Sequence, residues 1–366
     1  MSLRRGELVV TTGGPPTVET IAERAGVSIA SVSRVLNGHG ARPDTVRRVE
    51  RAAAEVGYVP NAVARSLKGG RSMQLTFAMQ DIGNPVYVAM VRQIQTITKA
   101  HGYRLLLHST DAVVEDELAV LHSLADRGCD GLILCPIRIT PEHIEALRSA
   151  AQPVVVIGSL PQDAPVDSIR ADSVTGSELA VRHLFETGRR RIAFVNGPAD
   201  TVPGRNRHRG YHQALGTCGL PADPALVETT EFTIDAGASA LHRLLDAAPG
   251  IDAVFCANDQ LALGASQALH TRGLRIPEDV AVVGMDDTVL VRAGWPPLTS
   301  VDLGSAERGR LAAEMLLERV AEVSAAAAVP AGGSSPGSSK APARVRTVTP
   351  RLVVRASSAP AEVASR

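Results

Sequence analysis

The chain has 366 residues, of which 45% are hydrophobic, so it is long enough for two or three domains with sizeable cores. Its 38 basic and 38 acidic side chains balance each other, and it has neither the run of about 18 apolar residues that a membrane span requires nor an apolar signal segment near residue 1. The four cysteines stand singly, without the Cys/His spacing of a zinc site. These features argue against a membrane protein and a disulfide-stabilised secreted domain, and we expect a cytoplasmic protein without metal or cofactor.

The charges are distributed unevenly along the chain. Up to Ser72 there are 11 Lys and Arg against 6 Asp and Glu, whereas the remainder has 27 against 32. A basic N-terminal part joined to a mildly acidic remainder is typical of a DNA-binding module attached to another domain. An excess of this size can also arise by chance, and it gains weight only where it coincides with a DNA-binding motif.

Residues 1–16 are rich in Gly, Pro and Thr, and we expect them to form a disordered leader. The next stretch, residues 17–37, has the pattern of two short helices joined by a tight turn. Thr17 is a plausible N-cap of the first helix, and Gly26 can adopt the positive φ that a sharp reversal requires. The apolar stripe of the first helix consists of Val18, Ile21, Ala22 and Ala25.

The second helix of this pair has an outer face that suits contact with DNA bases. Ser28 is expected to cap it, and Val32, Val35 and Leu36 to pack against the first helix. The outer residues are small and mostly uncharged, with one long donor: Ile29, Ala30, Ser31, Ser33 and Arg34. Such a face can approach base edges in the major groove, where Arg34 can form two hydrogen bonds to a guanine. Taken alone, the pattern also fits a two-helix hairpin packed in a core.

A third helix is predicted to begin at Arg42-Pro43, with apolar residues on one face and arginines on the other. It ends at the sequence GYVPN, residues 57–61, and a short segment at 62–68 follows.

From Gln74 onwards the pattern changes to strands and helices in alternation. Strands are predicted near 75–79, 104–107, 131–134, 153–157, 191–195, 226–230, 252–256, 280–283 and 349–355. Helices are predicted near 86–100, 115–127, 141–150, 174–187, 205–218, 236–247 and 259–272. This alternation implies parallel sheets covered by helices on both faces, and its two successive series imply two lobes. Ligands of such sheets bind beyond the carboxyl ends of the strands, which predicts a site between the lobes.

Several motifs together closely resemble the lactose repressor/galactose repressor family of bacterial transcription regulators. In the N-terminal part they are AERAGVSIASVSRVLNG followed by GYVPNAVARSLKGGRS. In the body they are DIGNP, RRIAFVNGP, FCANDQLALG, VVGMDD and PPLTSV. The resemblance implies an α plus α/β chain: an N-terminal helix-turn-helix, three-helix DNA-binding domain with a hinge helix, followed by a two-lobed α/β body like that of periplasmic binding proteins. It also implies that the chain crosses between the lobes three times.

The resemblance and the composition together predict the domain boundaries. After the leader, we expect a DNA-binding domain at 17–60, a hinge at 61–72 and a two-lobed domain for effector binding and dimerisation at 73–320. The N-terminal lobe is assigned 73–171, 298–320 and 346–358, and the C-terminal lobe 172–297. The Ala-, Gly-, Ser- and Pro-rich residues 321–345 are expected to be a flexible insertion, and 359–366 a disordered tail.

The resemblance assigns the DNA contacts to the second helix and the hinge. Ile29, Ala30 and Arg34 match positions that read bases, and the other predicted contacts of the first domain are Thr17, Ser28, Ser31, Ser33 and Asn37. For Ser33, a local backbone hydrogen bond is the alternative. In the hinge, Leu67 matches a residue that opens a minor-groove base step, although packing at a helix end is the alternative role. The other predicted hinge contacts are Asn61, Ala64 and Lys68.

The resemblance also assigns an effector site in the cleft. Arg207 matches an arginine that grips a sugar, Asn258 and Asp286 match positions that bind hydroxyls, and Phe232 matches an aromatic that stacks on the ligand. The remaining candidates are Asp81, Asn84, Ser159 and Arg205. For Asn84, which precedes Pro85, the alternative role is structural, namely to fix a turn.

Two other functions, an enzyme and a solute receptor for transport, fit the sequence less well. An enzyme is disfavoured because the sequence has no nucleophile elbow, P-loop or dinucleotide fingerprint after a strand. A solute receptor for transport would need a signal peptide in place of the DNA-binding head. The sequence therefore favours a regulator, a repressor in most members of the family, that binds a near-palindromic DNA operator as a homodimer and responds to a sugar or similar polar metabolite. It would act in the cytoplasm, associated with the nucleoid and not with a membrane.

Overall fold

The computed structural model describes residues 16–36, 40–58, 71–327 and 342–359. The chain divides into two compact units, Met1–Ser72 and Met73–Arg366, and we describe each by itself.

The described residues of the N-terminal unit form three helices, α1 (Val18–Ala25), α2 (Ile29–Leu36) and α3 (Pro43–Glu55). One buried side chain from each helix, Ile21, Val32 and Val49, forms the centre of its core. The cap of α1 is more complete than expected. Thr17 Oγ1 accepts a hydrogen bond from the backbone N–H of Thr20, and the hydroxyl of Thr20 accepts one from the backbone N–H of Thr17. Threonine thus takes the place that Glu or Gln has in the usual capping box.

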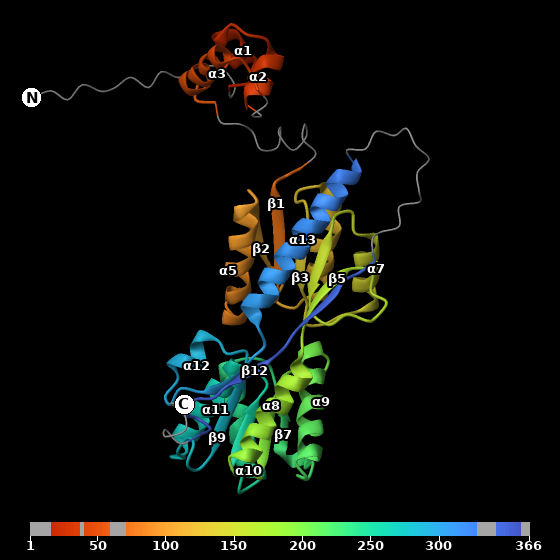
Figure 1. Cartoon of the computed structure of the whole chain (residues 1–366). Helices are drawn as coiled ribbons and strands as arrows, with labels where there is room; N and C mark the ends of the chain where they lie inside the picture. Colours follow the sequence, from red (N-terminus) through yellow and green to blue (C-terminus); the bar gives the residue numbers. More distant parts are fainter. Residues whose placement is uncertain (1–15, 37–39, 59–70, 328–341, 360–366) are drawn as a thin grey trace, which may run out of the picture. The chain divides into compact units, whose positions relative to one another are not determined.

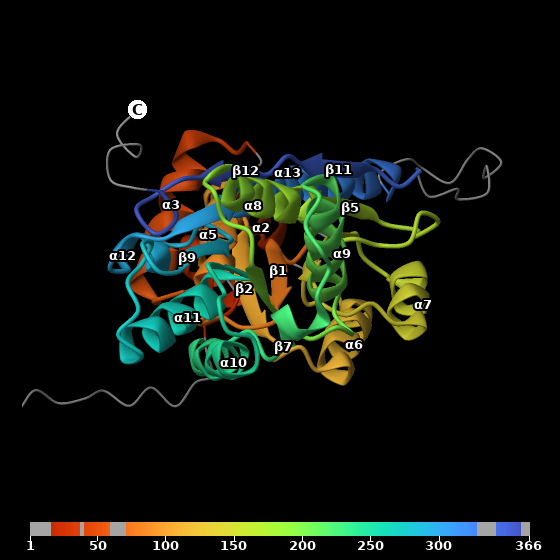
Figure 2. The same ribbon diagram turned by 90° about the horizontal axis from the view of Figure 1, so that it is seen from below.

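The first lobe of the C-terminal unit is built on a six-stranded parallel sheet. Its strands are β1 (Gln74–Met79), β2 (Arg104–Ser109), β3 (Leu132–Cys135), β4 (Val154–Ile157), β5 (Asp167–Ala171) and β11 (Val345–Val348), in the order β11-β5-β4-β3-β1-β2. One face is covered by α5 (Pro85–Ala100) and α13 (Ser305–Ala327), and the other by α6 (Val114–Ser123), the 3-10 turn η1 (Leu124–Asp126) and α7 (Pro141–Ser149) (Figure 2). Gly309 allows α13 and α5 to touch, since a Cβ there would lie 2.7 Å from the carbonyl oxygen of Met90.

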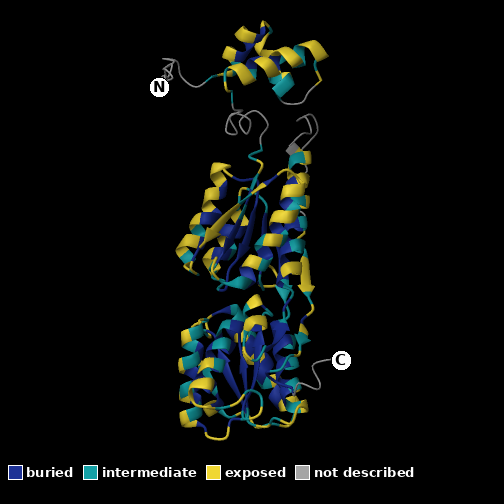
Figure 3. Ribbon diagram, turned by 90° about the vertical axis from the view of Figure 1, so that its left-hand side faces the viewer, coloured by how far each residue is buried: buried dark blue, intermediate teal, exposed yellow. Residues whose placement is uncertain are grey.

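The second lobe repeats this plan. Its strands are β6 (Ile192–Asn196), β7 (Val227–Thr229), β8 (Ala253–Cys256), β9 (Ala281–Met285), β10 (Thr299–Asp302) and β12 (Arg351–Val353), in the order β12-β10-β9-β8-β6-β7. Only β12 is antiparallel to its neighbour. Helices α8 (Ser173–Glu186) and α9 (Val202–Thr217) cover one face, and α10 (Ile234–Ala247) and α11 (Asp259–Thr271) the other (Figure 2). The lobe also contains the 3-10 turn η2 (Pro224–Leu226) and α12 (Val289–Ala293). Figure 3 shows the buried residues concentrated along the strands of both lobes.

The chain passes between the two lobes three times, as the resemblance implied (Figure 1). The passages follow β5 at Asp172, β10 at Gly304 and β11 at Pro350. The fold class expected from the sequence is therefore confirmed for its main parts: three helices precede a body of two lobes with parallel-dominated sheets. The predicted hinge helix at 61–72 lies almost wholly outside the described residues.

The assignment of C-terminal segments to lobes needs correction. We expected 298–320 and 346–358 in the first lobe, but β10 and β12 belong to the sheet of the second lobe. The reason is that β10 extends the second sheet by parallel pairing with β9 before the chain crosses. The prediction that residues 321–345 form an unordered insertion is also wrong at both ends. Residues 321–327 continue α13, because alanine-rich sequence propagates a helix that is already packed, and Val345 begins β11.

Candidate functional site

In the N-terminal unit, the turn between α1 and α2 is held by backbone geometry and one arginine. Gly26 has φ 62°, the left-handed conformation that favours glycine. The guanidinium of Arg48 donates to the carbonyl oxygens of Ala25 and Gly26, which joins α3 to the turn. Ser28 then caps α2 by accepting a hydrogen bond from the N–H of Ser31 at 3.2 Å. The start of α2 is therefore fixed relative to the rest of the unit.

The outer face of α2 has the exposure that DNA contact requires. Ile29 is 49% exposed, an unusual fraction for a large apolar side chain, and Ala30 and Arg34 are also exposed. Ser31 and Ser33 are half-buried at the edge of this face. The part of the chain that the structure describes contains no carboxylate within ion-pair distance of Arg34. Five predicted DNA contacts lie outside the described residues: Asn37, Asn61, Ala64, Leu67 and Lys68.

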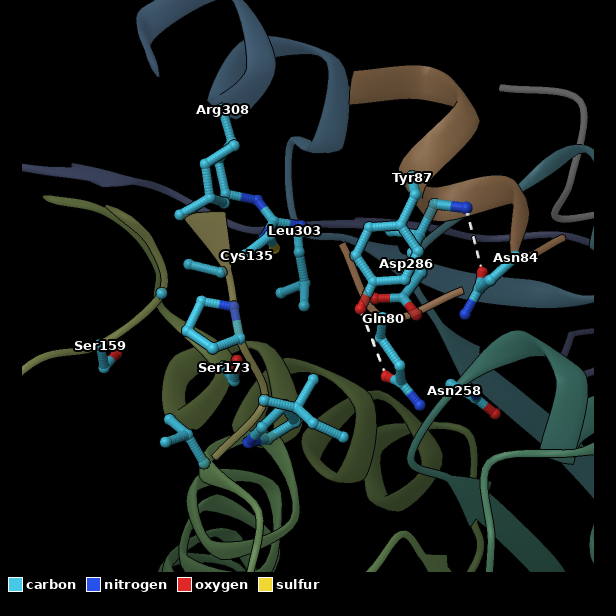
Figure 4. A pocket seen from close by; sticks show the side chains of 18 of the residues that line it. Gln80, Asn84, Tyr87, Cys135, Ser159, Ser173, Asn258, Asp286, Leu303 and Arg308 are labelled. Atoms are coloured by element: carbon cyan, nitrogen blue, oxygen red, sulfur yellow. Dashed lines mark hydrogen bonds between the residues drawn. The ribbon is translucent and has the colours of Figure 1, made fainter. Parts of the chain in front are cut away.

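In the C-terminal unit, a cavity of about 100 Å³ lies between the lobes at the carboxyl ends of their strands. It is lined from both lobes, in agreement with the general position of ligands in parallel sheets. Six of the eight predicted effector residues line it: Asn84, Ser159, Arg207, Phe232, Asn258 and Asp286. Figure 4 shows the polar side chains that converge there.

Arg207 on α9 is the most constrained of these side chains. One of its terminal nitrogens donates to the carbonyl oxygen of Ala257 at 2.6 Å, and the other lies 3.4 Å from Oδ1 of Asp286. Its guanidinium carbon is 5.7 Å from the ring centre of Phe232. Arg207 is 7% exposed and its Nε has no hydrogen-bond partner in the described structure. A buried donor without a partner is costly, and a hydrogen bond to a ligand oxygen would offset that cost.

Asp286 follows β9 and has φ 106°, a conformation that non-glycine residues rarely adopt. Such strain is commonly retained where a side chain must point in a particular direction. Burial raises the pKa of the Asp286 carboxyl, although Arg207 and Arg308 oppose this rise. Burial likewise lowers the pKa of Arg207, which Asp286 counteracts. The two charges thus stabilise each other in a site that otherwise penalises both.

The two predicted asparagines have a structural role as well as a position in the cavity. Asn258 caps α11 by accepting from the N–H of Leu261 at 2.8 Å, and Asn84 caps α5 by accepting from the N–H of Val86 at 3.1 Å (Figure 4). Each cap uses the side-chain oxygen, so the amide nitrogen of each side chain remains as a donor. The cap orients the side chain and leaves its NH₂ group for a ligand.

Two predicted residues are not part of the cavity. Arg205 is exposed, and its guanidinium donates to the carbonyl oxygen of Asp200. Residues two apart on a helix point about 200° apart, so Arg205 and Arg207 cannot face the same site. Asp81 also lies outside the lining, where its side chain accepts from the N–H of Gly83 at 2.7 Å in a local turn.

The cavity is also lined by residues that were not predicted from the sequence: Gln80, Tyr87, Cys135, Ser173, Asn206 and Arg308. Tyr87 Oη donates to Oε1 of Gln80 at 3.4 Å, and burial raises the pKa of this phenol well above its usual value. Burial also raises the pKa of the Cys135 thiol to about 12, which leaves it uncharged. Tyr87 and Arg308 lie in the first turns of α5 and α13. A search of the first helical turn after each strand could have found them.

Comparison with known proteins agrees with this architecture. Residues 17–61 match the model for bacterial regulatory proteins of the lacI family, and residues 181–358 match that for a periplasmic binding protein-like domain. The transcriptional regulator CelR of Thermobifida fusca is 36% identical over 314 residues, which cover 83% of this chain and 92% of CelR. The chain belongs to the lacI family. The repressor CytR of Escherichia coli K12, another relative, is 33% identical over 306 residues, covering 83% of this chain and 89% of CytR.

Solved structures of lacI-family proteins extend the match to nearly the whole chain. The lac repressor dimer bound to operator and the anti-inducer ONPF superposes with a TM-score of 0.81 at 27% identity, covering 94% of this chain and 99% of the repressor chain. A CelR–cellobiose complex gives a TM-score of 0.69 at 32% identity, covering 93% and 99%. The chain is thus a ligand-responsive helix-turn-helix regulator of transcription, in a family whose members are not enzymes.

The helices that the structure describes include none with the length and apolar character needed to cross a membrane.

Proposed function

We propose that this lacI-family chain is a repressor that binds a near-palindromic operator as a homodimer and is controlled by a sugar bound between its lobes. The observation that carries the proposal is the cavity whose polar side chains come from both lobes, with the buried Arg207–Asp286 pair at its centre. A ligand held by both lobes fixes the position of one lobe relative to the other. The chain can transmit this change of position to the DNA-binding domain. The relatives support the two binding partners: CelR has been seen with cellobiose, and the lac repressor dimer with its operator.

For the DNA side, we assign base reading to the exposed face of α2. Arg34 supplies the hydrogen-bonded discrimination, and Ile29 and Ala30 supply apolar contact to thymine methyl groups. We assign phosphate contacts to Thr17, Ser28, Ser31, Ser33 and Asn37, and hinge contacts in the minor groove to Asn61, Ala64, Leu67 and Lys68. The assignment divides the chain at the predicted boundaries, with the DNA-binding domain at 17–60 and the hinge at 61–72.

For the effector side, Arg207 would form charge-assisted hydrogen bonds to ligand oxygens, and Asp286 would accept from hydroxyl groups. Asn84 and Asn258 contribute their amide nitrogens, Ser159 a hydroxyl, and Phe232 an apolar surface for one side of a sugar ring. We further propose that the protein acts in the cytoplasm at the nucleoid and catalyses no reaction, because its family consists of transcription regulators.

The decisive experiment compares Arg207→Ala with Arg205→Ala. A panel of mono- and disaccharides is screened for thermal stabilisation of the full chain, and calorimetry then gives the affinity of the best sugar. Arg207→Ala should weaken binding about ten- to a hundredfold, because one charge-assisted hydrogen bond contributes about 1.5–3 kcal/mol. Arg205→Ala is the matched control, since its side chain lies on the same helix but outside the cavity.

Equal affinity of Arg207→Ala and the parent chain would refute the assignment of the site. Binding of the parent chain to a palindromic DNA fragment selected from a random library is the parallel test of the regulator function. Arg207→Ala should keep that DNA affinity in the absence of sugar while losing the response to it.

A further inference from the structure

The charges that face the cavity are not balanced. Its charged lining residues are Arg207, Arg308 and Asp286, that is, two guanidinium groups against one carboxylate. Asp286 is paired with Arg207. The residues that the structure describes offer Arg308 no ion-pair partner; its recorded side-chain hydrogen bond goes to Oγ of Ser305 at 3.1 Å. The cavity lining therefore has one more positively charged side chain than negatively charged ones.

The side chain of Arg308 lies in the cavity wall, where it can contact a ligand. It lies in the first turn of α13, just after the passage between the lobes at Gly304, and its side chain extends from α13 into the cavity beside Cys135 and Leu303 (Figure 4). It is only 8% exposed, and its Nε is buried without a hydrogen-bond partner. Burying an unpaired charge costs much free energy, and an opposite charge on a ligand would offset that cost.

The guanidinium groups of Arg308 and Arg207 both influence the titratable groups of the cavity. Arg308 is close enough to Asp286 and Tyr87 to lower the pKa of each, against the larger effect of burial. It also adds to the effect of burial in lowering the pKa of Arg207. Arg207, like Arg308, keeps an unpartnered Nε. Two buried guanidinium groups with free N–H donors form a suitable site for a planar carboxylate or a phosphate.

We propose that the effector of this protein is an anionic sugar, whose carboxylate or phosphate group binds between Arg308 and Arg207. The inference rests on the proposed function, because it takes the cavity to be the effector site. The hydroxyl groups of such a ligand would bind Asp286 and the amide nitrogens of Asn84 and Asn258. Arg308 is then the residue that selects charged over neutral sugars.

The test measures calorimetric affinities of the full chain for matched pairs of ligands. The anionic probes are a set of hexuronates, aldonates and hexose phosphates; the neutral partners are the corresponding hexuronamides, aldonamides and hexoses. We expect at least one anionic probe to bind more tightly than its neutral partner by about tenfold or more. Whether the best probe is a carboxylate or a phosphate identifies the anionic group. This comparison needs no variant, so it does not depend on how a substitution affects folding.

Two variants assign the preference to a residue. Arg308→Met removes the charge but keeps a long side chain, and it should abolish the preference for the anionic partner. Arg310→Met is the matched control: Arg310 lies two residues further along α13, outside the cavity, and its charge is already paired with Glu307 and Glu314. This variant should keep the preference.

The outcomes separate the two proposals. If a neutral sugar binds as tightly as its anionic partner, and this binding requires Arg207 but not Arg308, the inference is overturned while the proposed function stands. Survival of the anionic preference in Arg308→Met would also overturn the inference. If no probe of either kind binds the parent chain, both the inference and the proposed sugar effector are contradicted.

Discussion

At the scale of single residues, Asp259 shows how burial shifts the chemistry of a carboxyl group. It is 2% exposed at the start of α11, where it accepts from the N–H of Thr288 and the hydroxyl of Ser300, both at 2.6 Å. Burial, reinforced by the nearby charge of Asp286, raises the pKa of Asp259 to about 7 in spite of these hydrogen bonds. The residue thus connects α11 to β10 and to the loop after β9, and its charge depends on pH near neutrality.

The raised pKa predicts a pH dependence of stability. An unfolded chain releases the proton of an Asp near pH 4, whereas the folded chain keeps that of Asp259 to about pH 7. Between these values the folded state binds more protons, so the free energy of unfolding should fall as pH rises from about 4 to about 7. Asp259→Asn should remove this pH dependence. Its free energy of unfolding relative to that of the parent, measured by urea denaturation, should therefore increase from pH 5 to pH 8.

The control for this measurement is Asp279→Asn. Arg275 holds the pKa of the half-buried Asp279 at about 2, so this residue is ionised in both states across the same pH range. The difference in free energy of unfolding between Asp279→Asn and the parent should stay constant between pH 5 and pH 8. A constant difference for Asp259→Asn as well would show that Asp259 is already ionised in the folded chain at pH 5.

Arg34 gives a second prediction at this scale, because it is the long donor on the exposed face of α2. Arg34→Ala should lose about 1–3 kcal/mol of discrimination between the selected operator and a scrambled site, while much of the non-specific affinity remains. Fluorescence titrations with both DNAs at one salt concentration would measure this. Arg47→Ala, on the exposed face of α3, should weaken both complexes about equally. A parent-like ratio in Arg34→Ala would exclude it as the base reader.

At the scale of secondary-structure elements, a single carboxylate joins three segments of the first lobe. Asp167 at the start of β5 is 2% exposed, and it pairs with Arg319 of α13 at 2.9 Å and with Arg344 before β11 at 3.0 Å. Burial alone would raise the pKa of Asp167, but hydrogen bonds from the two arginines outweigh burial and hold it below its ordinary value. Charge therefore adds to the backbone pairing of β11 with β5 in holding this edge of the sheet, since the side chains of β11 are largely exposed.

Removing this carboxylate should be costly. Asp167→Ala leaves two partly buried guanidinium groups without their buried partner, with only the exposed Glu322 and Glu318 still paired to them, and should lower the free energy of unfolding by about 3–5 kcal/mol. Glu322→Ala is the matched control, because Glu322 pairs with the same Arg319 but is 53% exposed, and it should cost less than about 1 kcal/mol. Urea denaturation would measure both. Equal effects of the two substitutions would mean that the cluster around Asp167 contributes little.

At the scale of the whole molecule, three passages of the chain connect two lobes that each have their own core. A ligand in the cavity contacts both lobes, so it favours one of their relative positions. If that position alters how two DNA-binding domains meet an operator, ligand binding and DNA binding are coupled, and the coupling is reciprocal.

This reciprocity is measurable. The effector identified by the screen should change operator affinity about 5- to 150-fold, and operator DNA should change effector affinity by the same factor. Calorimetry with the effector in the presence and absence of operator tests the second half of the statement. The Arg207→Ala chain should bind DNA with an affinity that the effector does not alter. An effector affinity that operator DNA leaves unchanged would contradict the coupling.

Much of this architecture was determined by the sequence alone. The helix-turn-helix followed from local features: an N-cap at Thr17, a glycine with positive φ at Gly26 and apolar residues at helical spacing. The two lobes followed from the alternation of apolar strands with amphipathic helices. These properties are encoded over short stretches, because capping, turn conformation and periodic burial depend on neighbouring residues.

Only the tertiary structure decided which distant residues share a site or a sheet. β5, β10 and β11 were not predicted as strands, since short strands with polar or exposed positions are defined by their partners and not by their own pattern. The sequence offers both Arg207 and Arg205, with the resemblance favouring Arg207, and the rotation of α9 turns only Arg207 into the cavity. Arg308 is more than 100 residues from Arg207, and both line one cavity because the chain crosses between the lobes just before α13. The positive charge of the cavity is therefore a property of the assembled lobes, which no local stretch of sequence contains.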